Sequence, residues 1–338
     1  MHSHARPFSR RRFLGGLTVA GAAGLLGVHP RSVAAEPPPE TTRLRIAKYP
    51  YDVECLAPMW IGEELLRSEG FDDLQYVTPV EMAQYPAISA GHLDVGIVDI
   101  FSVLPRLDAG EAALMLAGVH AGCYELFAGA DVRSVRDLKG KTVHVSNPGR
   151  RGFVSAMVAH VGLDPQKEVT FIERSGREGI ALFEAGKVDA TLSFPPEPQE
   201  LRSRHIGTSI VNTATDRPWS QYFCCMIVGN REFVARHPVA TRRVLRALLK
   251  ATDLCASDPD LVARTLVQRG FVRNGEYAAQ ALREIPYRRW REYDAADSVR
   301  FYALRLHEVG AIRTNPQKLL AESVDWRFFE QLKREMKV

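Results

Sequence analysis

The chain after residue 42 alternates short apolar runs with helical repeats. Apolar residues dominate 44–49, and from 56 to 66 they recur at helical spacings until Gly70 ends the pattern. A strand, a helix closed by Gly91 and a further strand are expected at 74–77, 80–90 and 94–98. Strands that alternate with helices predict a parallel sheet with helices on its faces.

The same alternation returns later in the chain. Strands are predicted at 141–146, 169–172 and 188–194, and helices at 152–161 and 178–185. From Glu232 onward the pattern is mostly helical, and Asp258-Pro259 marks a helix start. A length of 338 residues is enough for two domains. We therefore predict an α/β protein of two similar, doubly wound lobes followed by a helical C-terminal tail.

Residues 1–35 have the pattern of an export signal. Ser9-Arg10-Arg11-Arg12-Phe13-Leu14 precedes fourteen uncharged residues, fewer than the about 20 that a membrane-spanning helix needs. Small residues at 32–35 suit a signal peptidase, and the double arginine resembles the twin-arginine signal that exports folded proteins. We expect a mature chain in the periplasm that starts near Ala35 or Glu36, with 36–42 as a linker. An ordinary secretion signal or an uncleaved anchor is the alternative.

The charge pattern argues against a nucleic-acid partner. The chain has 44 basic and 40 acidic residues, a net charge of +4. Five of the arginines and none of the acids precede Glu36, so removal of that segment leaves 39 basic against 40 acidic residues. The remaining charges are mixed in sign along the chain, whereas a nucleic-acid-binding surface needs clustered Lys and Arg.

The cysteines form no recognisable framework. They are Cys55, Cys123, Cys224, Cys225 and Cys255. Their number is odd and their spacing matches neither a disulfide pattern nor paired zinc ligands, so we expect mostly buried free thiols. His120 and Cys123 are three apart, but no second pair completes four ligands, and we predict no metal site. Cys224 and Cys225 are adjacent in an extended segment, so we expect them to point to opposite faces.

Several short motifs are informative in combination. Asp137-Leu138-Lys139-Gly140-Lys141-Thr142-Val143-His144-Val145 is one of them. Two turns of the form Gly-x-(Leu/Val)-Asp-(Val/Ala) occur at 91–95 and 186–190, and Gly162–Pro165 and Val324–Phe329 add to the set. Together with the export signal, and over about residues 43–335, these motifs resemble the periplasmic solute-binding proteins of ABC importers, in the nitrate/taurine/alkanesulfonate class.

The resemblance implies a type II periplasmic-binding-protein fold, whose chain crosses between two lobes twice. With crossings near 122–129 and 222–228, lobe one comprises 43–125 plus 226–338, and lobe two comprises 126–225. The implied function is capture of a small solute between the lobes and its delivery to an ABC permease and ATPase at the inner membrane. The resemblance implies no catalysis, no cofactor and a monomeric protein.

The same fold is also similar to the enzymes that make the pyrimidine of thiamine from histidine and pyridoxal phosphate. Phe223-Cys224-Cys225-Met226 falls where that family carries a cysteine-rich motif. Those enzymes need a lysine and a histidine just after the third strand, where this chain has Val98-Asp99-Ile100-Phe101-Ser102. Without the lysine there is no Schiff base. We therefore predict a binding protein, with a thiamine-pyrimidine synthase-like enzyme as the alternative.

Ligands of open α/β sheets bind at the carboxyl ends of the strands, so the loops after the predicted strands and the two crossings supply candidate contacts. The candidates are Tyr49, Tyr51, Asp52, Glu54, Asp99, Phe101, Ser102, His120, Tyr124, Ser146, Asn147, Arg150, Arg151, Ser193, Phe194, Glu197 and Tyr222. The segment Ser146–Gly152 combines glycines, a helix start and two arginines, which suits an anionic group. Alanine at Arg150 or Arg151 is therefore expected to weaken binding by about 1.5–3 kcal/mol and to leave folding nearly unchanged. The alternative is that both arginines are surface residues.

These candidates point to more than one ligand. The rings of Tyr49, Tyr51, Phe101 and Phe194 suit an aromatic or apolar ligand body, unless they pack into the cores of the lobes. Asp52, Glu54, Asp99 and Glu197 are acids, which suit the amine of a zwitterion or the amino group of a pyrimidine. A sulfonate, a nitrate-like anion, an aromatic acid and a pyrimidine are all compatible with the sequence.

Overall fold

The strands of this protein form three hydrogen-bonded sheets. The computed structural model describes residues 36–49, 52–79 and 84–336, so the predicted export signal and Tyr51 lie outside the described residues. The elements below belong to one compact unit that begins at Pro38. The strands are β1 (Arg43–Ala47), β2 (Asp73–Val77), β3 (Val95–Asp99), β4 (Ala113–Ala121), β5 (Glu125–Ala128), β6 (Lys141–Val145), β7 (Val169–Glu173), β8 (Ala190–Ser193), β9 (Thr208–Asn212) and β10 (Phe223–Asn230).

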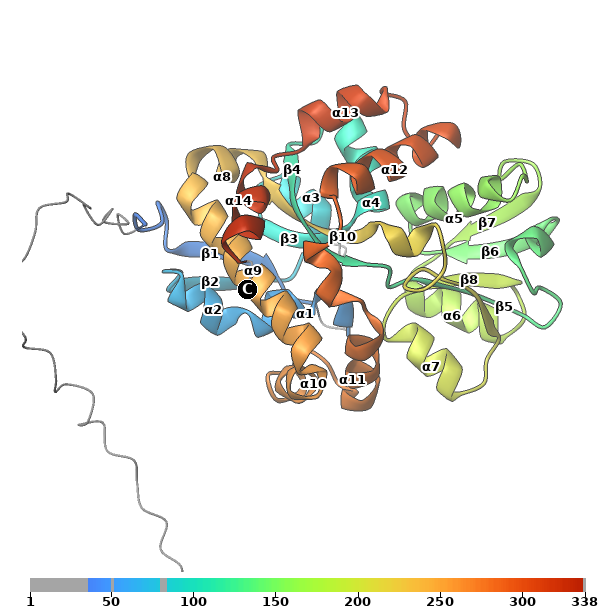
Figure 1. Ribbon diagram of the computed structural model, residues 1–338. Helices are drawn as coiled ribbons and strands as arrows, with labels where there is room; N and C mark the ends of the chain where they lie inside the picture. The colour runs from blue at the N-terminus through green and yellow to red at the C-terminus, as the bar shows by residue number, and fades with distance from the viewer. Residues whose placement is uncertain (1–35, 50–51, 80–83, 337–338) are drawn as a thin grey trace, which may run out of the picture. The chain divides into compact units, whose positions relative to one another are not determined.

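The largest sheet lies wholly within residues 125–212 and has the order β7-β6-β8-β5-β9. Strand β6 runs parallel to β7 and β8, whereas β5 is antiparallel to β8 and β9. Helices α5 (Pro148–His160) and α6 (Gly176–Glu184) lie on opposite faces of this sheet (Figure 1). The second predicted strand–helix alternation is thus confirmed, with β5 as an antiparallel addition.

The first predicted alternation is only partly a parallel sheet. Strands β1 and β2 pair in parallel, but β3 belongs to a separate antiparallel sheet with the order β3-β10-β4. The central strand of that sheet comes from residues 223–230, more than a hundred positions after β3. Local alternation cannot reveal such a distant partner, which explains why the prediction of one parallel sheet over 44–98 is wrong.

The remaining described elements are helical. They are α1 (Ala57–Ile61), α2 (Glu63–Ser68), α3 (Gln84–Ser89), α4 (Ile100–Asp108), α7 (Glu197–Ser203), α8 (Arg231–Arg236), α9 (Pro238–Ser257), α10 (Pro259–Gln268), α11 (Gly275–Glu284), α12 (Ala295–Glu308), α13 (Pro316–Ser323) and α14 (Arg327–Glu335), with 3-10 turns η1 (Glu54–Leu56), η3 (Val135–Leu138), η4 (Trp219–Gln221) and η5 (Tyr287–Arg291). Among the helices described, none has the length and apolar character of a membrane span. The expected helical C-terminal region is present, and its helix α12 packs on both α4 and α5.

The two Gly-x-(Leu/Val)-Asp turns perform the same structural task in both halves. Gly91 and Gly186 have positive φ angles of 74° and 64°, which side-chain-bearing residues rarely adopt. The aspartate three residues later accepts a backbone hydrogen bond from the first strand of its own half. Asp94 accepts from Arg45 N at 2.7 Å, and Asp189 accepts from Thr142 N at 2.8 Å. The repeated sequence motif therefore reflects a repeated way of fastening a turn to a strand.

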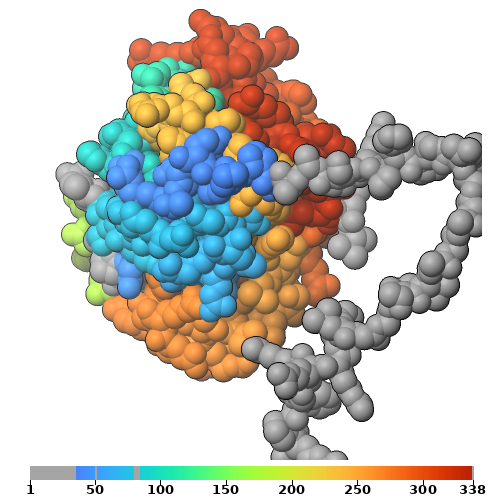
Figure 2. All heavy atoms as spheres, turned by 90° about the vertical axis from the view of Figure 1, so that its left-hand side faces the viewer, coloured from blue at the N-terminus to red at the C-terminus, as the bar shows by residue number. Residues whose placement is uncertain are grey.

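A large hydrophobic core cluster packs most of the helices against the strands, and a smaller one contains Phe127, Phe183, Val188 and Leu201. Trp60 is fully buried, stacks on Phe271 and donates its indole N–H to Ala47 O at 3.0 Å. Residues 38–42 lie on the surface, where Figure 2 shows this part of the chain in blue beside the yellow residues of α8 and α9. There Glu40 accepts hydrogen bonds from the first two free N–H groups of α9, so the segment predicted as a linker also caps a helix.

Candidate ligand-binding site

The N-termini of α4 and α5 meet at the carboxyl ends of β3 and β6. Asp99 caps α4 by accepting from Ser102 N at 2.9 Å, and Asn147 caps α5 by accepting from Arg150 N at 3.0 Å. The Asn147 cap and the following proline start α5 one turn earlier than predicted. A Cβ atom on Gly149 would lie 2.6 Å from Ser102 Cα, so this close approach of the two helices requires glycine.

Arg150 is the central cation of this junction. Its side chain is only 15% exposed, and Nη2 lies 3.8 Å from Asp99 Oδ2. The guanidinium stands 4.3 Å from the ring centre of Phe194 and 5.3 Å from that of Tyr124. The Tyr124 hydroxyl donates to Asp99 at 3.3 Å. Burial by itself would lower the pKa of Arg150, but Tyr124 and Asp99 outweigh it and raise that pKa, so the group stays charged.

Three carboxyl groups share this region with a single buried arginine. Glu54 is fully buried, and neither of its carboxylate oxygens has a hydrogen-bond partner among the described residues. Burial raises the pKa of Glu54 to about 8 and that of Glu197 to about 7, and it raises the pKa of Asp99 as well. Ser193 Oγ is likewise buried without a partner. The protein therefore leaves acceptors and donors unused in this buried polar centre.

Two further polar candidates take part in the junction itself. Ser146 Oγ accepts a hydrogen bond from the Arg150 guanidinium. Ser102 Oγ donates to Asn147 Oδ1 at 3.4 Å, which links the two helix starts directly. The sequence-predicted residues of the loops after β3, β6 and β8 are thus brought together.

Two charged candidates have partners outside this centre. Asp52 accepts from the Nε of Arg273 at 3.0 Å and from its backbone N at 2.9 Å. Arg151 is half exposed and lies 3.6 Å from Glu173 Oε1. Adjacent arginines on α5 therefore differ, because successive helical residues project about 100° apart and only one of them faces the junction.

Most of the aromatic candidates pack against protein rings. Phe101 is fully buried and stacks on Phe153 with ring centres 4.0 Å apart. Tyr222 stacks on Phe301 at 3.9 Å, and Tyr49 is buried in the main core cluster. The interpretation of the candidate rings as core residues therefore suits Phe101 and Tyr49, whereas Phe194 faces Arg150.

Four of the five cysteines gather beside the buried polar centre, together with His120. All five are buried and free, which confirms the expected free thiols. Cys224 Sγ lies 3.7 Å from Cys123 Sγ and 4.0 Å from Cys225 Sγ. The prediction that Cys224 and Cys225 point to opposite faces is wrong, because β10 is irregular at this point and its register against β4 shifts on both sides of Cys225.

Sequence reasoning did not include these thiols among the candidate contacts. The sequence did hold one indication: two of the cysteines are neighbours of candidate contacts, since Cys55 follows Glu54 and Cys123 precedes Tyr124. Burial of the thiols around His120 depends on the pairing of β10 with β4, which local sequence does not show.

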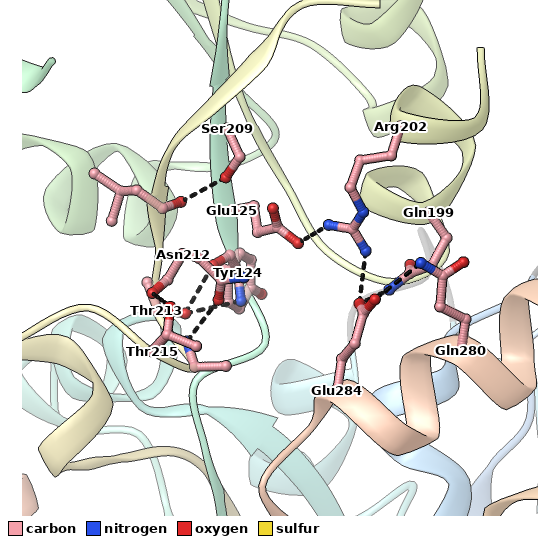
Figure 3. Close-up of polar contacts among 12 residues, drawn as sticks. Tyr124, Glu125, Gln199, Arg202, Ser209, Asn212, Thr213, Thr215, Gln280 and Glu284 are labelled. Atoms are coloured by element: carbon pink, nitrogen blue, oxygen red, sulfur yellow. Dashed lines mark hydrogen bonds and ion pairs between the residues drawn. The ribbon is translucent and has the colours of Figure 1, made fainter. Parts of the chain in front are cut away.

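A polar contact between α7 and α11 was also missed. Arg202 lies 2.6 Å from Glu284 Oε2 and bonds Glu125 at the start of β5 with the same guanidinium (Figure 3). Gln199 Nε2 donates to Glu284 at 2.8 Å. These residues lie far apart in the sequence, so no local motif predicts this contact. The contact ties the five-stranded sheet to the C-terminal helices at a second place.

The raised pKa of the Glu54 carboxyl predicts that the stability of the fold depends on pH. The groups that face it are Asp52, Cys55 and Glu197, and the Tyr287 hydroxyl donates to its backbone oxygen. Because its pKa is raised in the folded protein, the folded state holds a proton that the unfolded state has already lost between about pH 4.5 and 8. The stability contributed by this group therefore falls as pH rises through that window, by about 1.4 kcal/mol per pH unit at most.

Glu54→Gln should remove this slope, since the amide does not ionise. Urea unfolding at about pH 5 and about pH 8 is expected to show the variant gaining stability over the natural chain at the higher pH. Glu64→Gln is the control, because the Glu64 side chain is 84% exposed. Equal pH slopes in the natural chain and Glu54→Gln would contradict the buried neutral carboxyl.

Comparison with solved structures identifies the fold. The chain superposes on the alkanesulfonate-binding protein SsuA from Xanthomonas axonopodis pv. citri with a TM-score of 0.69 and 18% identity, covering 87% of this chain and 100% of SsuA. The nitrate-binding protein NrtA from Synechocystis PCC 6803 gives 0.69 and 12%, with 89% and 90% covered. DszB in complex with biphenyl-2-sulfinic acid gives 0.60 and 15%, with 87% and 99% covered. The chain has the periplasmic-binding-protein fold.

Comparison of sequences identifies the family. No curated protein matches the chain. The family model described as NMT1/THI5 like matches residues 65–261, which is more than half of the sequence and includes Asp99, Arg150 and both adjacent cysteines. This match, together with the shared fold, shows that the chain belongs to the NMT1/THI5-like family.

Proposed function

We propose that the chain is the solute-binding component of an ABC importer, which captures a small molecule and delivers it to a membrane permease and its ATPase. The observation that carries this proposal is the buried polar centre at the meeting of α4 and α5, where Glu54 and Ser193 keep unused hydrogen-bonding atoms. Buried polar atoms are normally paired, so a ligand is the natural partner for them. The sulfonate- and nitrate-binding proteins that share the fold support the same function.

The mechanism that we propose is closure of two lobes around the solute. Lobe one comprises 43–125 plus 226–338, and lobe two comprises 126–225. In support, the five-stranded sheet falls within 125–212, and the chain passes between the sheets after β4 and before β10. Hinge motion at these two crossings would open and close the junction, and the solute shifts the balance by binding the closed form more tightly. The permease then distinguishes loaded from empty protein.

The hydrogen-bonding groups of the site favour a nitrogenous solute over a sulfonate or nitrate. Glu54, Asp99 and Glu197 outnumber Arg150, and Arg150 already faces Asp99 at 3.8 Å. The cation that an oxyanion would need already faces a carboxylate, whereas an amino group can donate to a carboxyl oxygen of Glu54 even when that carboxyl is protonated. We infer a small compound with an amino-substituted ring or a protonated amine.

The decisive experiment identifies the small molecule that the purified chain retains, by mass spectrometry after denaturation. Thermal-shift titrations then compare 4-aminopyrimidine with methanesulfonate and nitrate. The aminopyrimidine should raise the melting temperature, and Glu54→Gln should reduce that rise while Glu64→Gln leaves it unchanged. The ligand should be recovered unaltered, since we propose no catalysis. Stabilisation by the two oxyanions alone would contradict the nitrogenous solute, and a chemically altered ligand would favour an enzyme.

We also propose that the chain reaches the periplasm by twin-arginine export and acts there as a monomer. The signal lies outside the described residues, so the proposal depends on the motif at 9–14 and on the small residues at 32–35. Replacing Arg10 and Arg11 together by lysine should leave precursor in the cytoplasm, as judged by fractionation. Unchanged export of that variant would show an ordinary secretion signal.

A further inference from the structure

One imidazole and two thiols lie close together in the protein interior, beside the buried polar centre. His120, Cys123 and Cys225 each offer a ligand atom, and these atoms all lie within 4.8 Å of one another. His120 is fully buried, and the two cysteines are 5% and 2% exposed. Separations of this size are within reach of a single ion, since zinc binds thiolate at about 2.3 Å and imidazole at about 2.0 Å.

The hydrogen bonding of His120 leaves one ring nitrogen available to a metal. Its Nδ1 lies 2.7 Å from Ala121 O. A carbonyl only accepts hydrogen bonds, so Nδ1 carries the proton and the lone pair is on Nε2. Histidine ligands are commonly fixed in this way by a backbone carbonyl. Nε2 itself is buried and has no hydrogen-bond partner in the part of the chain that the structure describes. An aromatic contact with Tyr287, at 5.1 Å between ring centres, holds the imidazole in place.

The fold brings these ligands together through strand pairing. Cys225 on β10 stands opposite His120 on β4, and the irregularity of β10 at Cys225 turns its thiol toward Cys123. Cys123 lies two residues beyond the end of β4. Cys224 Sγ is close to both thiols, so it is placed to supply a fourth ligand. His120 and Cys225 lie on neighbouring strands, which hold these two ligands rigidly and suit metal binding.

We propose that His120, Cys123 and Cys225 bind one thiophilic closed-shell metal ion, Zn²⁺ or Cu⁺. Thiolate and imidazole ligands select such ions over Mg²⁺ or Ca²⁺, which need oxygen ligands. Two thiolates neutralise Zn²⁺, whose tetrahedral preference Cys224 can complete, whereas Cu⁺ is satisfied by the three ligands alone. The proposed ligands do not include Glu54 or Arg150, and the proposal stands independently of the importer function proposed above.

The test uses the full mature chain, reduced and stripped of metal under anaerobic conditions. Titration with Co²⁺ should produce the thiolate-to-cobalt charge-transfer absorption at one ion per chain, and added Zn²⁺ should displace it. Titration with Cu⁺ against a chromophoric chelator measures the other ion. Cys225→Ser and Cys123→Ser should each weaken binding at least tenfold. Cys255→Ser is the matched control, a buried free cysteine in α9, and it should bind like the natural chain.

Fold integrity is checked by circular dichroism and by thermal unfolding of the metal-free variants. The metal should raise the melting temperature of the natural chain and of Cys255→Ser, but not that of Cys225→Ser. Cys225→Ala provides a second variant in case serine disturbs the core. If the natural chain binds Zn²⁺ more tightly than Cu⁺, and Cys224→Ser weakens its affinity for Zn²⁺, the site has four ligands. If it binds Cu⁺ more tightly than Zn²⁺, the site has three ligands. Absence of stoichiometric binding in the natural chain, or equal affinity in Cys225→Ser and Cys255→Ser, would overturn the proposal.

Discussion

Replacing Arg150 by alanine should lower the free energy of unfolding by about 3–5 kcal/mol, because it leaves the buried carboxylate of Asp99 without its cation. Arg150 is 15% exposed and stands 3.8 Å from Asp99, whose own side chain is 11% exposed. The same guanidinium covers the rings of Phe194 and Tyr124, so packing is lost as well. This burial revises the expectation from sequence that folding would be nearly unchanged. Urea denaturation at neutral pH measures the change.

Arg151→Ala is the matched control for Arg150→Ala. It removes an arginine from the next position of the same helix. The Arg151 side chain is 50% exposed, pairs with Glu173 at 3.6 Å and lies 5.4 Å from the ring centre of Phe171. Its effect should stay within about 0.5 kcal/mol. Asp99→Asn in the Arg150→Ala background should restore part of the stability, because the amide needs no cation. Equal stability of the two alanine variants would mean that Arg150 does not compensate the buried acids.

Adding a single methyl group at Gly149 should force the N-termini of α4 and α5 apart. The Cβ of Gly149→Ala would meet Ser102 Cα at 2.6 Å and Phe101 O at 2.9 Å, and both are backbone atoms that cannot rotate away. We expect a larger radius of gyration by small-angle scattering. We also expect at least a tenfold loss of affinity for the retained solute, about 1.4 kcal/mol. Both effects are expected because the two proposed lobes could no longer come close enough to contact the solute at the same time.

Gly129→Ala provides the control for this wedge. A Cβ at Gly129 would have a single neighbour within 4 Å, the backbone oxygen of Asp189 at 3.8 Å, which is an ordinary contact. The control should bind solute and scatter like the natural chain, and circular dichroism should show normal secondary structure in both variants. A Gly149→Ala protein that binds solute with unchanged affinity would argue against closure at this junction.

Much of the local structure follows from short-range patterns. The turns at Gly91 and Gly186, the cap at Asn147 and the helix start at Asp258-Pro259 all involve contacts within a few residues, so residue type is enough to predict them. The strands near 74–77, 141–146 and 169–172 are found within one or two residues of their predicted limits. The prediction of the pairing partner of β3 was wrong, because that partner, β10, comes from the second half of the chain.

The candidate site shows the same division. The loops after the predicted strands correctly supplied four residues of the site, because the carboxyl ends of parallel strands in one sheet lie at the same edge. These residues are Asp99, Asn147, Arg150 and Phe194. The same rule also named Asp52 and Arg151, which turn to Arg273 and Glu173. A position in a loop or on a helix start does not specify the direction of the side chain, so both kinds of residue look alike in the sequence.

The sequence alone determined the alternation of strands and helices, the repeated turns and the set of loops from which the site is built. These depend on periodicity, glycine conformation and helix capping, which act over one or two turns of chain. Only the tertiary structure decided that β10 inserts between β3 and β4, that the thiols of Cys224 and Cys225 converge on Cys123 and His120, and that Arg150 rather than Arg151 is buried. These outcomes depend on contacts between distant segments, and the free energy that selects them comes from burial shared by the whole core.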